Sequence, residues 1–599
     1  MRETVRKILR LNTPEDNRKL VLLVFINIGS SIVGLAGIAS VMPFVALVSH
    51  PDSIFKKWYL SSVYYYLDFQ STHDFIIFMG IALFLVFVIS NLVLAFSMWY
   101  NIGFTRQVSY NLSRSLLSYY LTQKYEFFLR RNSSDLVKNI FSEVGQVTNH
   151  IIKPWIELIA KGLLSVCIVI FLIIVSPGAA FLAVLLMGGL YAIIYLFIRR
   201  RVTKAGVKRV RTNKNRFSAA NEVFGGIKDV KLLGKEQIYN DRFSKAAYKY
   251  ESTLATVQVL SHLPRYFLEI VAFGGIILLV LALFIISGNI ENILPLIALY
   301  TFAGYRLMPS LEAVFKSLTS MRGSDASLDL LYREIEEYRI QDNSSFSHND
   351  NSRISFNDKV ELNNIVFYYK GLDKAIINNV SLDIKANTTI GFVGHTGCGK
   401  TTTVDIILGL LKARSGDLLV DGIAITEDNL RGWQNQLGYV PQQIYLADDT
   451  ITSNIAFGVP EKDIDIDAVK QAADIANIKT FIEEELPEKF NTVVGERGVR
   501  LSGGQRQRIG IARALYHDPA VLVFDEATSA LDNITEAAVM EAIDNIMGTK
   551  TIIMIAHRIS TVRKCDVIYY MDKGDIVAHG TYEELVNSCE EFRKVAGEL

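Results

Sequence analysis

The sequence has little cysteine and almost no net charge. Its four cysteines (Cys167, Cys398, Cys565 and Cys589) lie far apart, which argues against a disulfide framework and against a cysteine-bound metal. The 62 basic residues are balanced by 61 acidic ones, which argues against a nucleic-acid partner held by bulk charge. The first twenty residues are too polar for a cleavable signal peptide, so none is expected.

Hydrophobic residues make up 50% of the chain and are concentrated before residue 320. A membrane span needs about 20 apolar residues. Any one of the apolar stretches could instead be a buried core helix, but six of them within 320 residues favour a membrane domain. The six predicted spans are 20–48, 75–100, 155–176, 178–198, 266–287 and 291–315.

The rest of the chain divides by composition. Residues 321–355 include a run rich in Asn, Ser and Asp and are predicted to be a linker. Residues 356–599 have the composition of a soluble α/β domain. We therefore predict an all-α polytopic transmembrane domain over 1–320, followed by an α/β ATPase domain over 356–599.

The connections between the predicted spans differ in charge. The turns at 176–178 and 287–292 carry no Lys or Arg, whereas 101–150 and 199–265 are long and rich in both. Because positive segments stay in the cytoplasm, both termini and the soluble domain are expected there. The long segments are expected to continue the spans as helices. Lys153, Glu157 and Lys161 follow one another at i, i+4 and i+8, which predicts a ladder of salt bridges.

Residues 394–401, GHTGCGKT, fit the phosphate-binding loop G-x-x-x-x-G-K-[ST]. The loop follows an apolar strand, TIGFV, and precedes a helical segment, which is the context this motif requires. Its glycines let backbone N–H groups converge on phosphate, Lys400 can reach the β- and γ-phosphates, and the Thr401 hydroxyl can bind Mg²⁺. The sequence therefore predicts a site for ATP and Mg²⁺.

A second apolar strand, residues 521–524, ends at Asp525 and Glu526. Asp525 is placed to hold Mg²⁺, and Glu526 can polarise an attacking water as a general base. The alternative is that these two acids only begin a helix.

Residues 501–508, LSGGQRQR, place two glycines after a serine at the start of a helical segment. This segment resembles the signature of ATP-binding cassette (ABC) proteins, and the resemblance extends through the domain. It implies that Tyr369 stacks on adenine, that Gln442 senses Mg²⁺ and the attacking water, that residues 529–532 communicate across a dimer, and that His557 contacts the γ-phosphate. The ATP contacts implied by the loop and the resemblance together are Tyr369, Gly394, Thr396, Gly397, Cys398, Gly399, Lys400, Thr401, Thr402, Ser502, Gly503, Gly504, Gln505 and Asp532.

In ABC proteins the signature of one domain caps the ATP held by the phosphate loop of another. This chain carries one of each, so the resemblance implies a homodimer with two ATPase sites. Six spans ahead of the ATPase fit the exporter branch. Residues 120–144 and 221–236 resemble the exporter segments whose short helices dock on the ATPase domains.

The substrate is suggested by an aromatic outer segment, residues 53–69, predicted as one interfacial helix with a polar stripe that includes Lys57 and Tyr64. An ordinary aromatic belt is the alternative. The segment resembles PglK-type flippases, which move polyprenyl-pyrophosphate-linked oligosaccharides across the bacterial inner membrane. The resemblance implies that Arg306 and Arg265 attract the pyrophosphate. A salt bridge between Arg306 and Glu269 is the other interpretation.

Other functions share parts of this pattern. An exporter of other lipids, peptides or drugs would carry the same ATPase motifs. A soluble ABC ATPase of DNA repair or translation is disfavoured by the six spans. An ATP-gated channel would differ by carrying currents.

Overall fold

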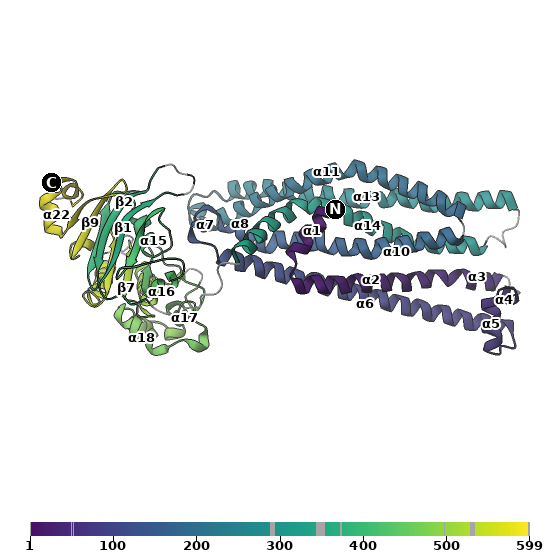
Figure 1. Ribbon diagram of the computed structural model, residues 1–599, viewed down its shortest axis with the longest axis horizontal. Helices are drawn as coiled ribbons and strands as arrows, with labels where there is room; N and C mark the ends of the chain where they lie inside the picture. The colour runs from purple at the N-terminus through teal and green to yellow at the C-terminus, as the bar shows by residue number, and fades with distance from the viewer. Residues whose placement is uncertain are drawn as a thin grey trace. The chain divides into compact units, whose positions relative to one another are not determined.

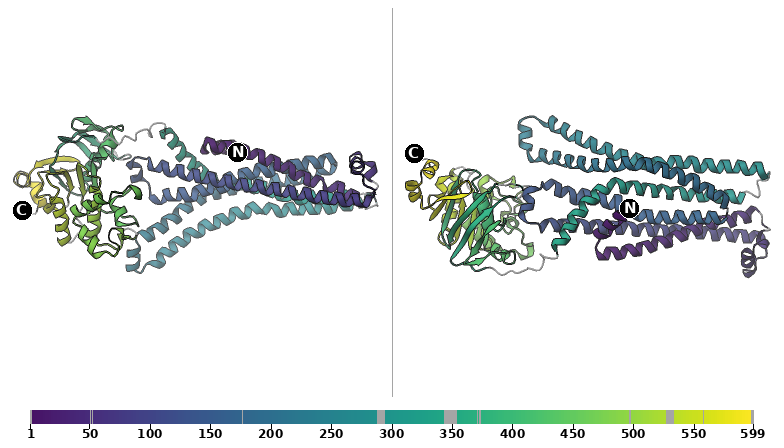
Figure 2. Two further views of the ribbon diagram at one scale, coloured as in Figure 1. Left: turned by 90° about the horizontal axis from the view of Figure 1, so that it is seen from below. Right: turned by 45° about the horizontal axis from the view of Figure 1, so that its top comes forward.

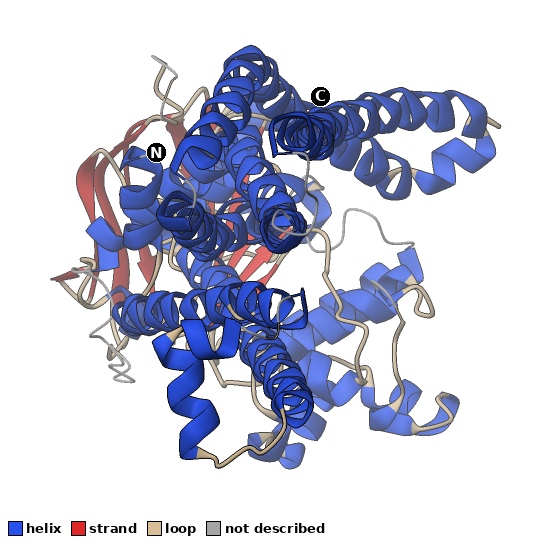
Figure 3. Ribbon diagram, turned by 90° about the vertical axis from the view of Figure 1, so that its right-hand side faces the viewer, coloured by secondary structure: helices blue, strands red, loops and turns tan. Residues whose placement is uncertain are grey.

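The computed structural model divides into two compact units, Met1–Gln123 with Arg130–Ser344, and Lys124–Leu129 with Ser345–Leu599. The structure describes the whole chain except residues 1, 50, 52, 176, 288–293, 343–353, 370, 372–373, 496–497, 527–532, 557 and 597–599. All strands among the described residues belong to the second unit and are red in Figure 3. The two units are therefore of different structural classes.

Long helices that run side by side make up most of the first unit (Figures 1 and 2). Among the described residues these are α2 (Pro14–Ala39), α6 (Thr72–Leu121), α10 (Lys153–Val175), α11 (Pro177–Gly225), α13 (Glu236–Ser287) and α14 (Leu294–Asp342). The 50 residues of α6 give a length of about 75 Å, well beyond the roughly 30 Å of a bilayer core. The expected continuation of the spans as helices is thus confirmed.

By length and composition, three helical stretches within the described residues can cross a membrane. They are Pro14–Gly37, Thr72–Leu121 and Ser133–Val175. The predicted spans 178–198 and 266–287 lie within α11 and α13, and residues 294–315 lie within α14. Residues 291–293 of the sixth predicted span are outside the described residues.

The first predicted span is wrong as a single helix. Residues 20–48 are divided between α2, which ends at Ala39, and α3 (Val41–Ser49). Pro43 explains the break, because it has no N–H to donate to the carbonyl of residue 39 and its ring collides with that carbonyl. The predicted linker is also wrong over its first part, since α14 continues to Asp342.

The outer segment is two short helices and not one. Lys57 is extended (φ −108°, ψ 116°) between α4 (Ser53–Lys56) and α5 (Trp58–Tyr66). Tyr64, expected on the polar stripe, is instead buried in a cluster with Leu47, Ile54, Leu60 and Phe75. Tyr64 leaves that stripe because its ring packs edge-on against Phe75, with centroids 5.3 Å apart.

The remaining helices of the first unit are short. The α-helices among them are α1 (Arg2–Leu11), α8 (Ser133–Lys138), α9 (Val144–Val147) and α12 (Ile227–Leu232), whereas all of α7 (Tyr125–Arg130) except Arg130 belongs to the second unit. The segments predicted to contain docking helices, 120–144 and 221–236, hold α7, α8 and α12. Residues 124–129 cluster with the second unit, where the Lys124 ammonium lies 2.6 Å from the Glu427 carboxylate.

Two sheets build the second unit. A four-stranded antiparallel sheet has the order β2-β1-β4-β5, and a six-stranded sheet has the order β10-β9-β3-β8-β7-β6. The strands are β1 (Lys359–Phe367), β2 (Ile377–Lys385), β3 (Thr389–Gly394), β4 (Ser415–Val420), β5 (Ile423–Ala424), β6 (Leu437–Val440), β7 (Val521–Asp525), β8 (Thr551–Ile555), β9 (Val567–Asp572) and β10 (Asp575–Gly580). Every residue of β8 is buried, as expected for a parallel strand covered on both faces.

Helices make up most of the rest of the second unit. They are α15 (Lys400–Ile407), α16 (Leu430–Gln434), α17 (Ile451–Ile455), α18 (Ile466–Ile475), α19 (Gly503–Leu515), α20 (Asn533–Asp544), α21 (Ile559–Val562), α22 (Tyr582–Ser588) and α23 (Glu590–Ala596). The core residues fall into two buried clusters that contain alternate residues of β7: Val521 and Val523 in one, Leu522 and Phe524 in the other.

In the first unit α11 and α14 approach each other closely at two glycines. A Cβ added at Gly206 would lie 2.4 Å from the carbonyl oxygen of Gly323, whereas one added at Gly103 in α6 would meet no atom within 4 Å. The two backbones can therefore touch only because Gly206 has no side chain.

We predict that Gly206→Ala lowers the stability of the protein by about 1–3 kcal/mol, because the new methyl group forces α11 and α14 apart. Gly103→Ala is the matched control and should be neutral or stabilising by up to about 1 kcal/mol, through helix propensity alone. Thermal unfolding in detergent measures both. Equal melting temperatures for the two variants would contradict the close approach.

Candidate functional site

The phosphate loop joins the end of β3 to the start of α15. Its glycines all have positive φ: Gly399 has φ 114° as the N-cap of α15, Gly397 has φ 83°, and Gly394 has φ 153°. A Cβ at Gly394 would lie 2.1 Å from the Met571 carbonyl oxygen. The loop therefore has the tight path that a phosphate cradle needs.

Lys400 is buried at the first position of α15. Its ammonium donates to the carbonyl oxygens of Gly394 (2.7 Å) and His395 (3.2 Å). An ammonium has three N–H donors, so these two bonds fix its direction and leave one donor for a phosphate oxygen.

Cys398 lies inside the same loop and is 4% exposed. Its sulfur is 3.9 Å from the Lys400 ammonium, and its backbone N–H donates to the His395 carbonyl at 3.1 Å. The thiol therefore packs beneath the loop, as a small buried side chain would.

The register of the strands brings Asp525, Glu526 and Gln442 to the same edge of the sheet as the phosphate loop. In the parallel ladders Phe392 of β3 and Asp525 of β7 both pair with Ile555 of β8, and Val440 of β6 pairs with Phe524. Because the carboxyl ends of these four strands meet, the residues that follow them converge. The phosphate loop, Asp525 with Glu526, and Gln442 thus share one edge.

Glu526 holds an unusual backbone conformation for a residue other than glycine, with φ 48°. Its N–H donates to the Ile555 carbonyl at 3.1 Å. Its carboxylate accepts a hydrogen bond from the side-chain amide of Gln442. Gln442 therefore orients the carboxylate that was predicted to be the general base.

Negative charge gathers next to these residues. Burial raises the pKa of Asp405 to about 6, and the neighbouring Asp525 carboxylate adds to the shift. The Tyr439 hydroxyl donates to Asp525 at 3.3 Å. Within the described residues no group of three His, Cys, Asp or Glu side chains could hold a metal alone. Mg²⁺ commonly takes one or two carboxylates and completes its shell with water and substrate phosphates, so Asp525 and Thr401 fit this ion.

Tyr369 lies beyond the end of β1, beside the helix that follows the phosphate loop. Its hydroxyl is 3.3 Å from the Thr402 hydroxyl, and its ring packs edge-on against Phe367 with centroids 5.0 Å apart. The position fits the expected contact with a nucleotide base next to the loop.

The signature serine begins α19 with a capping box. The Ser502 hydroxyl accepts from the Gln505 N–H (3.2 Å), and the Gln505 side chain accepts from the Ser502 N–H (2.8 Å). Ser502 and Gly503 are exposed. No hydrogen bond or ion pair among the described residues joins Ser502 or Gly503 to the phosphate loop. His557 and Asp532, the other two predicted site residues of this domain, lie outside the described residues.

The predicted substrate arginines of the first unit differ in their surroundings. Arg265 forms ion pairs with Glu269 (2.8 Å) and Glu312 (3.6 Å). The alternative salt bridge of Arg306 with Glu269 is therefore wrong, because Arg265 lies one helical turn away and takes that carboxylate. Arg306 is partly buried and forms no ion pair within the described part of the chain.

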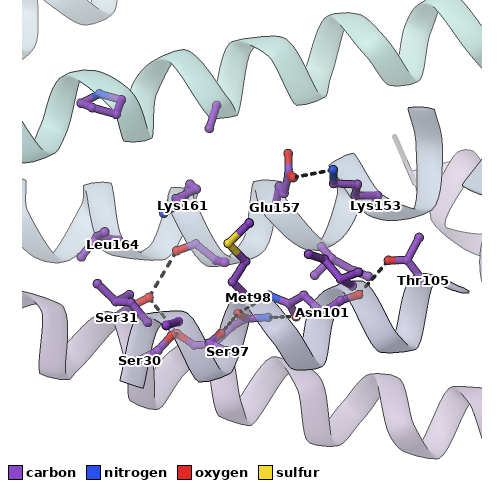
Figure 4. Close-up of a pocket in the computed structure, with 18 of the residues that line it drawn as sticks. Ser30, Ser31, Ser97, Met98, Asn101, Thr105, Lys153, Glu157, Lys161 and Leu164 are labelled. Atoms are coloured by element: carbon purple, nitrogen blue, oxygen red, sulfur yellow. Dashed lines mark hydrogen bonds and ion pairs between the residues drawn. The ribbon is translucent and has the colours of Figure 1, made fainter. Parts of the chain in front are cut away.

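The predicted series of salt bridges on α10 is also wrong for its second pair, Glu157 with Lys161. Lys153 and Glu157 pair at 3.8 Å, but no salt bridge joins Glu157 to Lys161. Lys161 instead lines a pocket between α2, α6, α10 and α14 (Figure 4). The sequence analysis missed this pocket, although a lysine inside the apolar stretch 155–176 was a signal for it.

Comparison with known families identifies both units. Residues 377–529 match the family model for ABC transporter, and residues 21–310 match ABC transporter transmembrane region. A solved structure, a bacterial Atm1-family ABC exporter with ATP bound, superposes with a TM-score of 0.73 at 23% identity and covers 98% of this chain and 99% of that one. This likeness supports the exporter fold.

Curated relatives extend over most of the chain. The ATP-dependent lipid A-core flippase of Pseudomonas aeruginosa is 29% identical and covers 93% of this chain and 91% of its own length. The flippase of the same name from Cupriavidus pinatubonensis is 31% identical over 77% of both chains. The heterocyst differentiation ATP-binding protein HepA of a Nostoc species is 30% identical over 77% of this chain and 74% of that one. This chain belongs to the ABC transporter family and is an ATP-hydrolysing exporter whose helical membrane domain precedes its ATPase domain.

Proposed function

We propose that this protein is a lipid flippase that moves a polyprenyl-pyrophosphate-linked oligosaccharide across the bacterial inner membrane. The observation that carries the proposal is Arg306, a permanently charged group within a predicted span. It lies about fifteen residues from the outer end of that span, roughly 22 Å down and past the midplane of a 30 Å core. Such a charge is costly unless it has a function, and a guanidinium suits a pyrophosphate.

The outer segment supports a lipid substrate. Trp58, Tyr65 and Tyr66 of α5 are 80%, 68% and 89% exposed, whereas Tyr64 is buried. Large exposed rings of this kind are stable against acyl chains or a polyprenyl tail. The second candidate is transport of a lipid A-core, which is favoured by the names of the relatives at 29% and 31% identity.

We further propose a homodimer, with both termini and the ATPase domains in the cytoplasm. The support is that the chain has one phosphate loop and one signature, and that Ser502 and Gly503 at the start of α19 are exposed and form no hydrogen bond with that loop among the described residues. A second copy would bring Ser502–Gly504 to the ATP. The ATPase domain is proposed to keep its predicted boundaries, residues 356–599, whereas the membrane domain extends past the predicted residue 320 because α14 continues to Asp342.

In the proposed ATPase mechanism Lys400 and the loop N–H groups bind the phosphates, and Tyr369 stacks on the adenine. Glu526, oriented by Gln442, takes a proton from the attacking water. Asp525 and Thr401 would hold Mg²⁺, which neutralises charge on the β- and γ-phosphates. His557 contacts the γ-phosphate, and Asp532 belongs to the loop that faces the partner.

We predict that Glu526→Gln slows steady-state ATP hydrolysis by at least about 100-fold, because an amide cannot accept the proton. ATP binding should persist, since the amide has nearly the same shape. Glu461→Gln, at an exposed position of the same domain, is the control and should hydrolyse ATP normally. Glu526→Gln activity near that of the wild type would refute the assignment of the base.

We predict that Arg306→Ala abolishes flipping of a fluorescent lipid-linked oligosaccharide in proteoliposomes. The melting temperature should change little, because no carboxylate among the described residues loses a partner. Lipid A-core, tested in the same vesicles, separates the two candidate substrates. If neither lipid is moved by the wild-type protein, the proposed function is wrong. If Arg306→Ala still transports, Arg306 does not bind the substrate.

A further inference from the structure

A cavity of about 510 Å³ lies between α2, α6, α10 and α14 in the first unit. Cavities of roughly 300–1,000 Å³ accommodate small molecules or headgroups. Figure 4 shows Lys153, Glu157 and Lys161 along one helix, facing Ser97, Met98, Asn101 and Thr105 on another. The cavity thus has two chemically different walls, one cationic and one of uncharged polar groups.

The uncharged wall is formed by amide and hydroxyl groups of α2 and α6. The Asn27 side-chain oxygen accepts from the Ser97 hydroxyl (2.9 Å) and from the Asn101 amide (3.1 Å). Asn27 is 1% exposed, in a helix otherwise apolar enough to span a membrane. Burying an apolar side chain such as leucine at this position would cost less free energy than burying an amide. Amide and hydroxyl groups can both donate and accept hydrogen bonds, which suits them to sugar hydroxyls.

The cationic wall carries more positive charge than its carboxylates neutralise. Glu157 pairs with Lys153, and Glu312 is engaged by Arg265 (3.6 Å) and by His262 (3.2 Å). Within the described part of the chain, neither Lys161 nor Lys316 has a carboxylate within 4.0 Å.

A third cation lies on the same helix as Lys316. Arg306 precedes Lys316 by ten residues on α14 and forms no ion pair within the described part of the chain. Unpaired charges in a membrane protein are expensive and mark the path of an ion or a charged substrate.

We infer that this cavity binds the phosphate-bearing sugar headgroup of the transported lipid, with Lys161 and Lys316 on the phosphate and Asn101, oriented by Asn27, on the sugar hydroxyls. The inference rests on the proposed function and adds the chemistry of its substrate site. Lys161 and Lys316 take the role of phosphate ligand that the sequence analysis assigned to Arg265. Arg265 is not suited to that role, because its guanidinium is already paired with two carboxylates. Pyrophosphate-linked oligosaccharides and lipid A-core share this headgroup chemistry, so the site accepts either source.

The depth of the cavity suits loading from the cytoplasmic leaflet. In the proposed topology α10 rises from the cytoplasm, and Lys161 is eight residues, about 12 Å, beyond Lys153. Lys316 lies twenty-two residues, about 33 Å, along α14 from its outer end at Leu294. Both lysines therefore lie on the cytoplasmic side, where a headgroup can enter while its tail stays in lipid.

The test is equilibrium binding to the full-length protein in detergent, with three probes. These are a polyprenyl-pyrophosphate-linked disaccharide, a lipid A-core, and a neutral glycolipid without phosphate. Lys161→Gln and Lys316→Gln should each weaken binding of at least one phosphorylated probe by about tenfold, as expected for loss of a charged hydrogen bond. Binding of the neutral glycolipid should be unchanged. Which phosphorylated probe responds identifies the source of the headgroup.

Lys204→Gln is the control, since this lysine is exposed on α11 and does not line the cavity. It should bind all three probes as the wild type does. Lys161→Arg retains the charge and should keep most of the affinity, which separates loss of charge from damage to the fold.

Several results would overturn the inference: no binding of either phosphorylated probe by the wild type, normal binding by both Lys161→Gln and Lys316→Gln, or an equal loss in Lys204→Gln. An equal loss for neutral and phosphorylated probes would also overturn it. Flipping is measured separately. If the wild-type protein binds a phosphorylated probe but does not flip it, only the proposed function is refuted. If the wild-type protein flips the probe and Lys161→Gln and Lys316→Gln both bind it normally, only this inference is refuted.

Discussion

The parallel register of β3, β8, β7 and β6 is the constraint on which the ATPase site depends. Phe392, Ile555 and Asp525 lie in one row across the sheet, so the loops that follow their strands must begin at the same edge. A shift of one residue in any strand would turn its side chains to the opposite face and move the carboxylates away from the phosphate loop. The fully buried β8, between β3 and β7, makes such a shift costly.

In the membrane unit the balance of charges distinguishes structural from functional groups. Arg265 pairs with both Glu269 and Glu312, so the positions of these three charges are explained by their contacts with one another. Lys161, Lys316 and Arg306 have no comparable carboxylates among the described residues, and two of them face a cavity lined by amides and hydroxyls. A cation that already has carboxylate partners has little to gain from an anionic ligand, whereas unpaired cations beside a cavity can bind one through charged hydrogen bonds.

The limits of sequence-based prediction appear at helix ends. Pro43 breaks the first predicted span, Lys57 divides the outer segment, and α14 runs through the start of the predicted linker. Composition reports average polarity over many residues, but a helix stops where single backbone hydrogen bonds fail. A polar helix with packed neighbours also continues past the point where its sequence ceases to be apolar.

The sequence by itself determined the two-unit organisation, the phosphate loop with its strand and helix, and the family. Long apolar stretches and glycine-rich loops of this kind are compatible with few other structures. It also placed Asp525 and Glu526 at a strand end. Only the tertiary structure decided that Glu269 pairs with Arg265 and that Lys161 forms no salt bridge with Glu157. Ion pairs depend on which helices pack together, and spacing along one helix cannot show that a neighbouring helix supplies a nearer partner.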